Sequence, residues 1–316
     1  MARPPDDQGD PGLAVVLPTD LAETIREVLA HLRAQTVANQ IGLVVVAPSA
    51  DNVLGELATE LDGFHSIQGV ELDPWLSLPL ARAGGTRAAR APLIAFSETH
   101  CFPDPNWAET MIETHRGPWA AVGPEMNNEN PARAISWANL LLDYGAWVAP
   151  AEAGPVDDLP GHNSCYKRAV LLDYGDELGP LLQAESILHR DLRARGHRLY
   201  LQPAAKVHHR NIARLGPSLR TAFQSGRNFA GLRERDWTTL RRAAYAAGSF
   251  LIPFVRLARI AADRRRKGMG SELPRVLPAM ACVLIASAAG ELVGYLAGGG
   301  SSLQRIAPVE LHRDGT

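Results

Sequence analysis

Cysteine is scarce in this sequence, and the few cysteines present are too scattered to organise a fold. They stand at Cys101, Cys165 and Cys282 in a chain of 316 residues, and no two of them form a C-x-x-C pair. This pattern excludes a disulfide framework and a zinc knuckle, and it favours a reducing compartment. Residues 1–12 (MARPPDDQGDPG) lack the apolar run of a signal peptide, so we expect a flexible tail there.

The charges are unevenly distributed along the chain, although the formal net charge is only −2. Residues 210–275 contain fifteen Lys and Arg against four Asp and Glu. Such a basic region is attracted to anionic surfaces, either lipid headgroups or phosphates. A solvated, arginine-rich helical face is the alternative. Few aromatic residues and no recognisable nucleic-acid-binding motif accompany the arginines, so we expect no nucleic-acid partner.

Apolar runs of strand length alternate with segments of helical periodicity in the first third of the chain. Continuous apolar runs are typical of buried parallel strands, and three of them occupy Leu13 to Leu17, Ile41 to Val46 and Leu93 to Phe96. The alternation predicts an α/β fold with a mostly parallel sheet flanked by helices. Ligands of such folds bind beyond the carboxyl ends of the strands. Glu98 and His100 follow the third run at such an end.

Two apolar stretches lie near the C-terminus, at residues 243–262 and 276–296. Each is long enough to cross a bilayer, but each contains a proline and an ionisable residue, which is unfavourable at that depth. A spanning hairpin would also place the basic residues between them outside, against the positive-inside tendency. We therefore expect helices that lie in the inner interface of the cell membrane, or that pack on the body of a cytoplasmic protein. The interrupting residues are Pro253, Arg256, Arg259, Pro278 and Glu291.

The segment from Ala81 to His100 (ARAGGTRAARAPLIAFSETH) combines a helix that begins A-R, a small-residue turn, an apolar strand and an acidic tripeptide. It resembles the family 2 glycosyltransferases of the GT-A fold, in which an A-R-N-x-G helix precedes a strand and a D-x-D motif. The D-x-D position reads Glu98-Thr99-His100 here, and Arg82 stands at the helix arginine. The resemblance extends from Leu13 to Asn211 and implies a nucleotide-sugar donor, with its diphosphate bound around Glu98 and His100.

A divalent metal ion at Glu98 and His100 is part of what the resemblance implies, because the leaving diphosphate carries charge that must be neutralised. Residues two apart in an extended segment point the same way, so both side chains are expected to reach one ion. A carboxylate with an imidazole favours Mn²⁺ over Mg²⁺. Two alternatives remain open. In the first, Glu98 and His100 are a surface-exposed pair that binds no ligand. In the second, His100 donates a hydrogen bond directly to the diphosphate, and no metal is needed.

Two further matches concern the nucleotide. Pro18 and Thr19 resemble the P-T turn after the first strand of the family, which contacts the base. The segment Val44 to Asp51 (VVVAPSAD) stands at the place of the family's V-D-D-G-S-x-D, and only Asp51 of its acidic residues remains. Asp51 is therefore a nucleotide-binding candidate, and its alternative role is to cap the following helix.

The acceptor side and the catalytic base are implied by two later motifs. His162 and Asn163 belong to a segment that resembles the family's G-x-N-x-x-x-R-R floor, where they offer hydrogen bonds to sugar hydroxyl groups; a structural loop is the alternative. Glu185 is the remaining acid of the family's E-D pair, since its second position is Ser186. An inverting transfer needs a carboxylate to accept the proton of the acceptor hydroxyl, so Glu185 is the candidate base; a helix-surface glutamate is the alternative.

A last motif, P-x-A-x-V-x-H, assigns a histidine to the diphosphate or the metal. The pattern favours His208 over its neighbour His209, and adjacent strand residues point apart, so only one of them is expected to serve.

The sequence thus predicts a flexible tail (1–12), a GT-A catalytic domain (13–211), a basic and apolar helical membrane-associating region (212–300) and a polar tail (301–316). The implied function is inverting transfer of a hexose from a nucleotide sugar to a glycan or a lipid-linked acceptor, by an enzyme on the inner face of the cell membrane. A degenerate, non-catalytic binding protein at the membrane is the alternative. A nucleotidyltransferase is disfavoured, because no glycine-rich phosphate loop follows the first strand.

Overall fold

The chain forms two compact units in the computed structural model, which describes residues 9–73, 77–234 and 237–313. We call residues up to Asn127, together with Ala149–His209, the sheet unit. The helical unit consists of Asn128–Val148 and the residues from Arg210 onward. Residues 128–148, which the sequence places in the domain 13–211, therefore group with the C-terminal helices. The predicted tails fall partly outside the described residues, and Ser302–Leu311 of the second tail forms helix α13.

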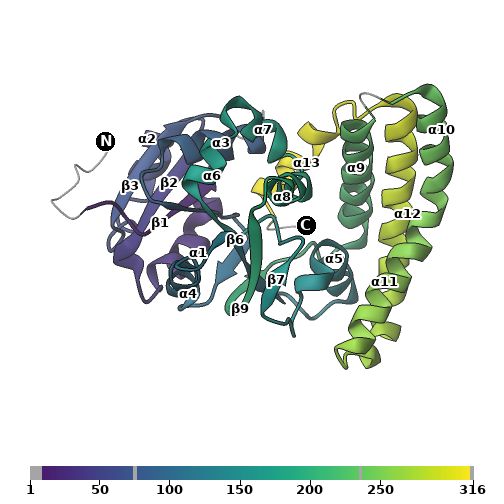
Figure 1. Ribbon diagram of the computed structural model, residues 1–316, viewed down its shortest axis with the longest axis horizontal. Coiled ribbons are helices and arrows are strands. Elements are labelled where there is room, and N and C mark those ends of the chain that lie inside the picture. Colours follow the sequence, from purple (N-terminus) through teal and green to yellow (C-terminus); the bar gives the residue numbers. More distant parts are fainter. Residues whose placement is uncertain (1–8, 74–76, 235–236, 314–316) are drawn as a thin grey trace. The chain divides into compact units, whose positions relative to one another are not determined.

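A nine-stranded sheet is the core of the sheet unit (Figure 1). Its strand order is β3-β2-β1-β4-β8-β6-β9-β5, and β7 pairs with β9. The strands are β1 (Leu13–Pro18), β2 (Ile41–Ala47), β3 (Ser66–Glu71), β4 (Leu93–Phe96), β5 (Cys101–Pro103), β6 (Trp119–Asn128), β7 (Gly154–Val156), β8 (Cys165–Lys167) and β9 (Arg198–His209).

Strands β3, β2, β1 and β4 are parallel neighbours. Every residue of β1, β2 and β4 is buried, as expected for parallel strands that helices cover on both faces. These strands are the three apolar runs of the sequence. Because they run in the same direction, their carboxyl ends meet at one edge of the sheet, where β1 ends at Pro18 and β4 at Phe96.

In the rest of the sheet, the strand pairs that the structure describes are antiparallel. Strand β8 lies antiparallel to β4 and β6, and β9 lies antiparallel to β5 and β7. The predicted α/β class, a sheet flanked by helices, is confirmed, but the sheet is mixed where the sequence indicated a mostly parallel one. The reason is the length of β5, β7 and β8, which have three residues each. Segments this short carry no detectable hydrophobic period.

Helices flank this sheet, and α3 brings a charged side chain to its edge. Helix α3 begins after Ser77, whose side chain accepts a hydrogen bond from the Leu80 amide, and it packs against β1 and β2. Arg82 stands in its first turns and is buried. The helices of the sheet unit are α1 (Ala22–Arg33), α2 (Ala50–Glu56), α3 (Leu78–Ala88), α4 (Trp107–Thr114), α6 (Arg168–Leu172), α7 (Leu178–Leu181) and α8 (Glu185–Ala194).

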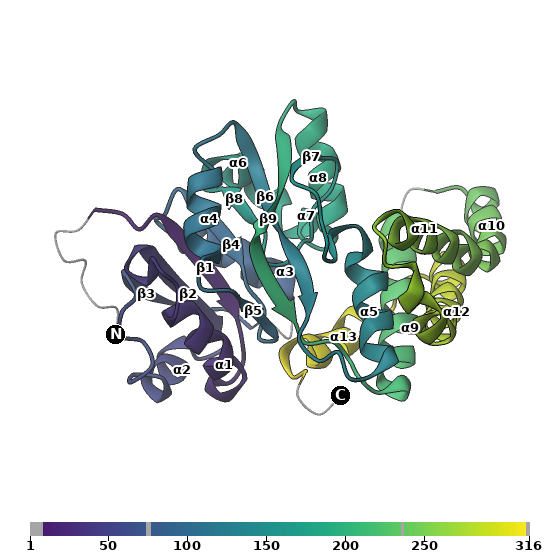
Figure 2. The same ribbon diagram turned by 90° about the horizontal axis from the view of Figure 1, so that it is seen from below.

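Helix α12 is the central element of the helical unit, where α5, α9, α10 and α11 all contact it. Helices α9 and α12 lie side by side in both ribbon views (Figures 1 and 2). Their backbones approach so closely that a Cβ atom at Gly290 would overlap the carbonyl oxygen of Phe223. The helices of this unit are α5 (Ala134–Tyr144), α9 (Leu215–Arg233), α10 (Thr239–Gly248), α11 (Ile252–Arg266), α12 (Leu273–Ala297) and α13 (Ser302–Leu311).

A buried histidine makes the sheet unit sensitive to acid. His115 ends α4, and its Nε2 lies 2.9 Å from the carbonyl oxygen of Cys165 on β8. Burial, reinforced by the positive charge of Lys167, lowers the pKa of His115 from its ordinary 6.5 to about 4. The unfolded chain therefore takes up a proton near pH 6.5, whereas the folded chain resists it until about pH 4. Acidification between these values favours the unfolded state.

We expect the free energy of unfolding to fall by about 2 kcal/mol from this histidine alone between pH 7.5 and pH 5. The His115→Gln variant, whose amide can still donate to the Cys165 carbonyl, lacks this titration and should lose about that much less over the same interval. Urea unfolding of both proteins at the two pH values measures the difference. Equal losses in both proteins would show that His115 is not the group responsible.

Candidate functional site

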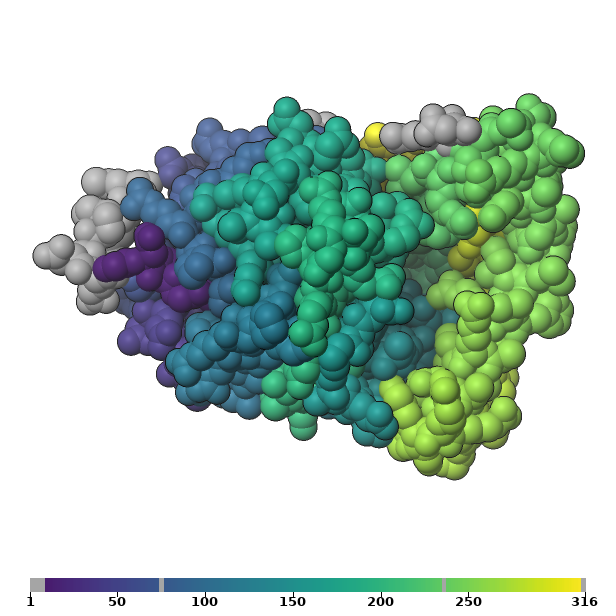
Figure 3. All heavy atoms as spheres, viewed as in Figure 1, coloured from purple at the N-terminus to yellow at the C-terminus, as the bar shows by residue number. Residues whose placement is uncertain are grey.

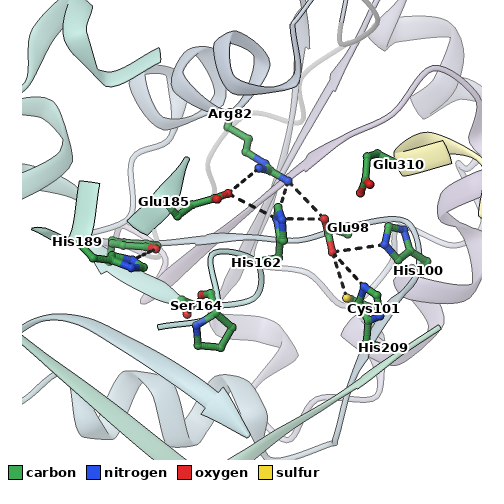
Figure 4. A network of polar contacts seen from close by, with 12 residues as sticks. Arg82, Glu98, His100, Cys101, His162, Ser164, Glu185, His189, His209 and Glu310 are labelled. Carbon is green, nitrogen blue, oxygen red and sulfur yellow. Dashed lines mark hydrogen bonds and ion pairs between the residues drawn. The ribbon is translucent and has the colours of Figure 1, made fainter. Parts of the chain in front are cut away.

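A cluster of polar side chains lies where β4 ends. Strand β4 is apolar and buried to Phe96, and residues 97–100 then turn the chain into β5. Glu98 stands in this turn with only 6% of its surface exposed. Figure 4 shows that its two carboxylate oxygens face different partners, one toward Arg82 and His162 and the other toward His100, Cys101 and His209. Glu98 therefore joins two halves of one site.

The first half of the site carries a buried cation. Nη2 of Arg82 lies 3.6 Å from Oε1 of Glu98 and 2.7 Å from Nδ1 of His162. The same histidine nitrogen lies 3.0 Å from Glu98 Oε1. His162 accepts from Arg82 when its proton is on Nε2 and donates to Glu98 when its proton is on Nδ1. The tautomer of His162 thus decides which of the two groups it serves.

Arg82 also holds a second carboxylate. Its Nη1 donates to Oε1 of Glu185 at 3.1 Å, and Glu185 opens helix α8, where the helix dipole favours a negative charge. Gly161 makes this placement sterically possible, because a Cβ atom at residue 161 would overlap the Glu185 carboxyl group. The side chain of Glu185 keeps 18% of its surface exposed, so it is held in place and still reachable.

The second half of the site gathers metal-binding donors on Oε2 of Glu98. This oxygen lies 3.3 Å from Sγ of Cys101, 3.5 Å from Nε2 of His100 and 3.9 Å from Nε2 of His209. All four side chains are buried, and one donor atom from each lies within 4.8 Å of the others. The two imidazole rings meet edge to face, with centroids 4.9 Å apart. One oxygen, two nitrogens and one sulfur at this spacing fit a divalent metal ion.

The register of two antiparallel strands decides which histidine joins the cluster. In the β5–β9 pair, Cys101 stands opposite His209 and Phe102 stands opposite His208. Cys101 and His209 therefore point to the same face of the strand pair, and both lie near Oε2 of Glu98. His208, which the sequence pattern favoured, points to the other face, where its Nε2 lies 3.0 Å from Oδ1 of Asp104. His209, and not His208, therefore faces Glu98, and a role of His208 at the diphosphate remains a prediction.

The remaining residues selected from the sequence have separate positions. Thr19 directly follows Pro18, the last residue of β1, and is buried. Its hydroxyl oxygen lies 2.7 Å from that of Thr24. Asn163 adopts a φ of 60°. Its backbone N–H donates to the backbone carbonyl of Phe96 at 2.7 Å, which connects the loop of His162 to the end of β4. Asp51 lies exposed in the first turn of α2.

A series of hydrogen bonds through buried Tyr166 and His189 fixes the helix that carries Glu185. The Tyr166 hydroxyl on β8 lies 2.8 Å from Nε2 of His189 on α8, and Nδ1 of His189 bonds to Asp158. Burial raises the pKa of Tyr166 well above its ordinary value, and the negative charges of Glu185 and Asp158 raise it further. The hydroxyl therefore remains a donor. His189 follows Glu185 by one helical turn, so these hydrogen bonds hold the Glu185 end of α8 against the sheet.

Sequence reasoning located every member of the first half of the site, but only Glu98 and His100 of the second half. Arg82, Glu98, His100, His162 and Glu185 were all selected, and the structure brings them together. Cys101, His209 and His189 were not. A two-residue period counted from Glu98 and His100 would skip Cys101, and His209 is set opposite Cys101 only by the register of β5 against β9, so neither residue carries a signal in the sequence alone.

The arrangement offers two chemical functions a few ångströms apart. Glu185 is an accessible carboxylate that can accept a proton. Beside it, Arg82 and the Glu98 cluster provide a fixed cation and donors for a metal ion, which together can stabilise a polyanion. Proton acceptance next to charge stabilisation is what displacement of a phosphate-bearing leaving group requires.

Comparison with protein-family models gives no match, and neither does comparison with curated proteins. Among solved structures, the chain resembles the mannosyltransferase PcManGT from Pyrobaculum calidifontis in complex with GDP-Man and Mn²⁺, with a TM-score of 0.54 and 18% identity over 91% of this chain and 89% of that chain. It also matches S. aureus TarS 1–349 in complex with UDP, with a TM-score of 0.46 and 15% identity over 90% of this chain and 91% of that one. The likeness to PcManGT shows that the chain has the GT-A type of fold, as the sequence predicted.

Proposed function

We propose that this protein is a glycosyltransferase that transfers a hexose from a nucleotide sugar to an acceptor hydroxyl group with inversion. The observation that carries the proposal is the position of Glu185 in the same ion-pair network as Glu98, with Arg82 between them at 3.1 and 3.6 Å. On a GT-A fold, this network places a proton acceptor next to a site for the diphosphate. PcManGT, the fold relative, binds GDP-Man.

The proposed reaction is a single displacement. The acceptor oxygen forms a bond to the anomeric carbon while the bond from that carbon to the diphosphate breaks, and Glu185 takes the hydroxyl proton. The nucleoside diphosphate leaves with the electron pair of the broken bond. Arg82 stabilises the diphosphate charge by charge-assisted hydrogen bonds. His162 and Asn163 lie on the loop that borders this site, and we propose that they bind the sugar or the acceptor.

A divalent ion held by Glu98 and His100 would neutralise charge on the leaving diphosphate. Of the two ions that the family resemblance suggests, imidazole ligation favours Mn²⁺ over Mg²⁺, and the PcManGT complex contains Mn²⁺. For the nucleotide, we propose Pro18 and Thr19 as base contacts, because they lie at the carboxyl end of β1, at the same edge of the sheet as Glu98. Asp51 remains a candidate for the ribose.

The test of this proposal is nucleoside diphosphate release from GDP-, UDP- and dTDP-sugars in the presence of Mn²⁺, with GDP-mannose first. We expect slow hydrolysis of one donor and its acceleration by sugar alcohols that mimic a glycan acceptor. Binding of a donor without any release would instead support the second candidate, a non-catalytic binding protein. That candidate is motivated by Ser186, which stands where the family has its second acid. Neither binding nor release across the panel would contradict both.

We further propose that the helical unit attaches the enzyme to the inner face of the cell membrane, where a lipid-linked or glycan acceptor would be presented. Among the described residues, two helical segments, 239–266 and 270–297, are long and apolar enough to cross a bilayer. The second contains α12, which four other helices contact, so it is the core helix of this unit. The first carries three largely exposed apolar side chains, Leu240, Phe250 and Phe254, whose exposed fractions are 82%, 68% and 72%.

Exposed basic residues, including Arg259 and Arg265, follow the exposed apolar ones along α11. Atoms of α10 and α11, drawn in light green, form a continuous surface on the helical unit (Figure 3). Arg256 is turned inward, and its guanidinium donates to the Leu142 carbonyl at 2.7 Å. An apolar face rimmed by arginine is typical of a helix lying in an anionic membrane interface, which is the arrangement we propose for residues 239–266.

We expect the protein to float with vesicles that contain anionic lipid and to be released in part by high salt. Replacing Leu240, Phe250 and Phe254 with serine should reduce the bound fraction at least about 10-fold, because three large apolar side chains each contribute about 1.5–3 kcal/mol when they leave water. Leu21→Ser, a change at an exposed leucine of the sheet unit, is the matched control. Equal flotation of all three proteins would rule out this surface.

A further inference from the structure

The donor atoms around Oε2 of Glu98 include a cysteine, which changes the metal that they suit. Cys101 is fully buried, and His100 and His209 are each 2% exposed, so the three side chains converge in a site shielded from bulk water. The carboxylate–imidazole pair of Glu98 and His100 alone would suit Mn²⁺. A thiolate and a second imidazole move the preference toward softer ions, because sulfur ligands select Zn²⁺ over Mn²⁺ and Mg²⁺.

The spacing of the donors also suits Zn²⁺. With Zn–N and Zn–O distances of about 2.0–2.2 Å and a Zn–S distance of about 2.3 Å, neighbouring donors of a tetrahedral site lie about 3.3–3.6 Å apart. The distances from Glu98 Oε2 to Cys101 Sγ and to His100 Nε2 are 3.3 and 3.5 Å. The distance to His209 Nε2 is 3.9 Å, and all four donor atoms lie within 4.8 Å of one another, so small side-chain movements would bring them to tetrahedral spacing.

The other oxygen of Glu98 is engaged outside this donor set. Oε1 is held by His162 at 3.0 Å and Arg82 at 3.6 Å. Glu98 thus presents a single oxygen to an ion, and its orientation is fixed by outer partners in the way that metal-binding carboxylates usually are. The shared carboxylate couples the metal-binding half of the site to the half that contains Glu185.

We propose that Glu98, His100, Cys101 and His209 form a zinc site, with Cys101 bound as a thiolate that releases its proton to solvent on binding. The inference rests on the proposed function only for the use of the ion: four protein ligands fill a tetrahedral site, so a diphosphate would reach the ion by adding a fifth ligand or by displacing one of the four. Ion binding itself needs no donor. The competing explanation is a buried thiol that donates a hydrogen bond to Glu98 and binds no metal.

Cobalt(II) is the probe, because it replaces Zn²⁺ and reports its ligands by absorption. Metal-stripped full-length protein titrated with Co²⁺ should bind one equivalent. Its spectrum should show a thiolate-to-cobalt charge-transfer band in the near ultraviolet and intense tetrahedral bands in the visible. One equivalent of Zn²⁺ should remove both, whereas Mn²⁺ and Mg²⁺ at the same concentration should leave them unchanged.

Two variants and one control locate the site. Cys101→Ser should abolish the charge-transfer band and weaken Zn²⁺ binding at least about 10-fold, and His209→Ala should weaken it by a similar factor. Cys282→Ser, a change at the exposed cysteine of α12, should leave the spectrum and the affinity unchanged. Thermal unfolding without metal shows whether each variant folds, and Zn²⁺ should raise the melting temperature of the wild type more than that of Cys101→Ser.

The outcomes separate this proposal from the proposed function. Cobalt binding without a charge-transfer band, Mn²⁺ binding as tight as Zn²⁺ binding, or no binding at all would overturn the zinc site. If the zinc site is found but no donor is turned over with Zn²⁺, Co²⁺ or Mn²⁺, the glycosyltransferase proposal fails and the metal site stands.

Discussion

The Glu185→Gln variant is expected to lose about 10²–10⁴-fold in kcat, because a positioned general base contributes that much to proton transfer. The amide has the size of the carboxylate and keeps an oxygen that can accept from Nη1 of Arg82, which lies 3.1 Å from Glu185 Oε1. The network around Glu98 should therefore persist. Donor binding should change less than about 3-fold, since the base acts on the acceptor and its effect appears in the transition state.

Glu177→Gln provides the matched control, because Glu177 is an exposed carboxylate on the short helix before α7. Its kcat should equal that of the wild type. Isothermal calorimetry gives the donor affinity of each protein, and initial rates at saturating donor give kcat. A Glu185→Gln enzyme with wild-type kcat would assign the proton to another acceptor, and the inverting mechanism through Glu185 would be abandoned.

The Glu98→Gln variant is expected to lose about 10²–10³-fold in kcat/KM, together with its affinity for divalent ions. Glu98 contacts both halves of the site, through Arg82 and His162 on Oε1 and through three donors on Oε2. Charge neutralisation at a leaving diphosphate is worth several kcal/mol, and each 1.4 kcal/mol is a factor of ten in rate. Because glutamine keeps the volume, the loss reports the charge.

The control for this variant is Glu113→Gln on helix α4, where the carboxylate is exposed. Both proteins are assayed with and without added metal after chelation. The control should lose its activity on chelation and regain it with metal, whereas Glu98→Gln should respond weakly to both. If the wild type keeps full activity in chelator, His100 serves the diphosphate directly, and Glu98 acts through Arg82 and His162 alone.

The positions of the candidate site residues relative to the strands follow from the sequence alone. Glu98 and His100 follow the apolar run Leu93 to Phe96, and a buried parallel strand must end where such a run ends, so a polar pair directly after it lies at the ligand-binding edge. The same reasoning selected Pro18 and Thr19 after the first strand. These inferences depend only on the local chain, which is why they needed no tertiary information.

The choice between neighbours was beyond the sequence. His208 and His209 are adjacent, and the pattern favoured His208. The pairing of Cys101 with His209 in the β5–β9 ladder places His209, and not His208, beside Glu98, because a shift of one residue in register moves every side chain to the opposite face. Cys101 gained a role for the same reason. As a lone cysteine in the sequence it indicated nothing beyond a reducing environment.

The sequence by itself determined that an acidic residue and a histidine stand at the end of a buried strand, and that basic, apolar helices follow the sheet. Both are consequences of local composition and period. Only the tertiary structure decided that Arg82, Glu98, His162 and Glu185 form one ion-pair network, and that Cys101 and His209 complete a metal-binding set around Glu98. These contacts join a helix, two turns, the start of another helix and two paired strands. They depend on tertiary packing and strand register, and no local sequence pattern encodes either.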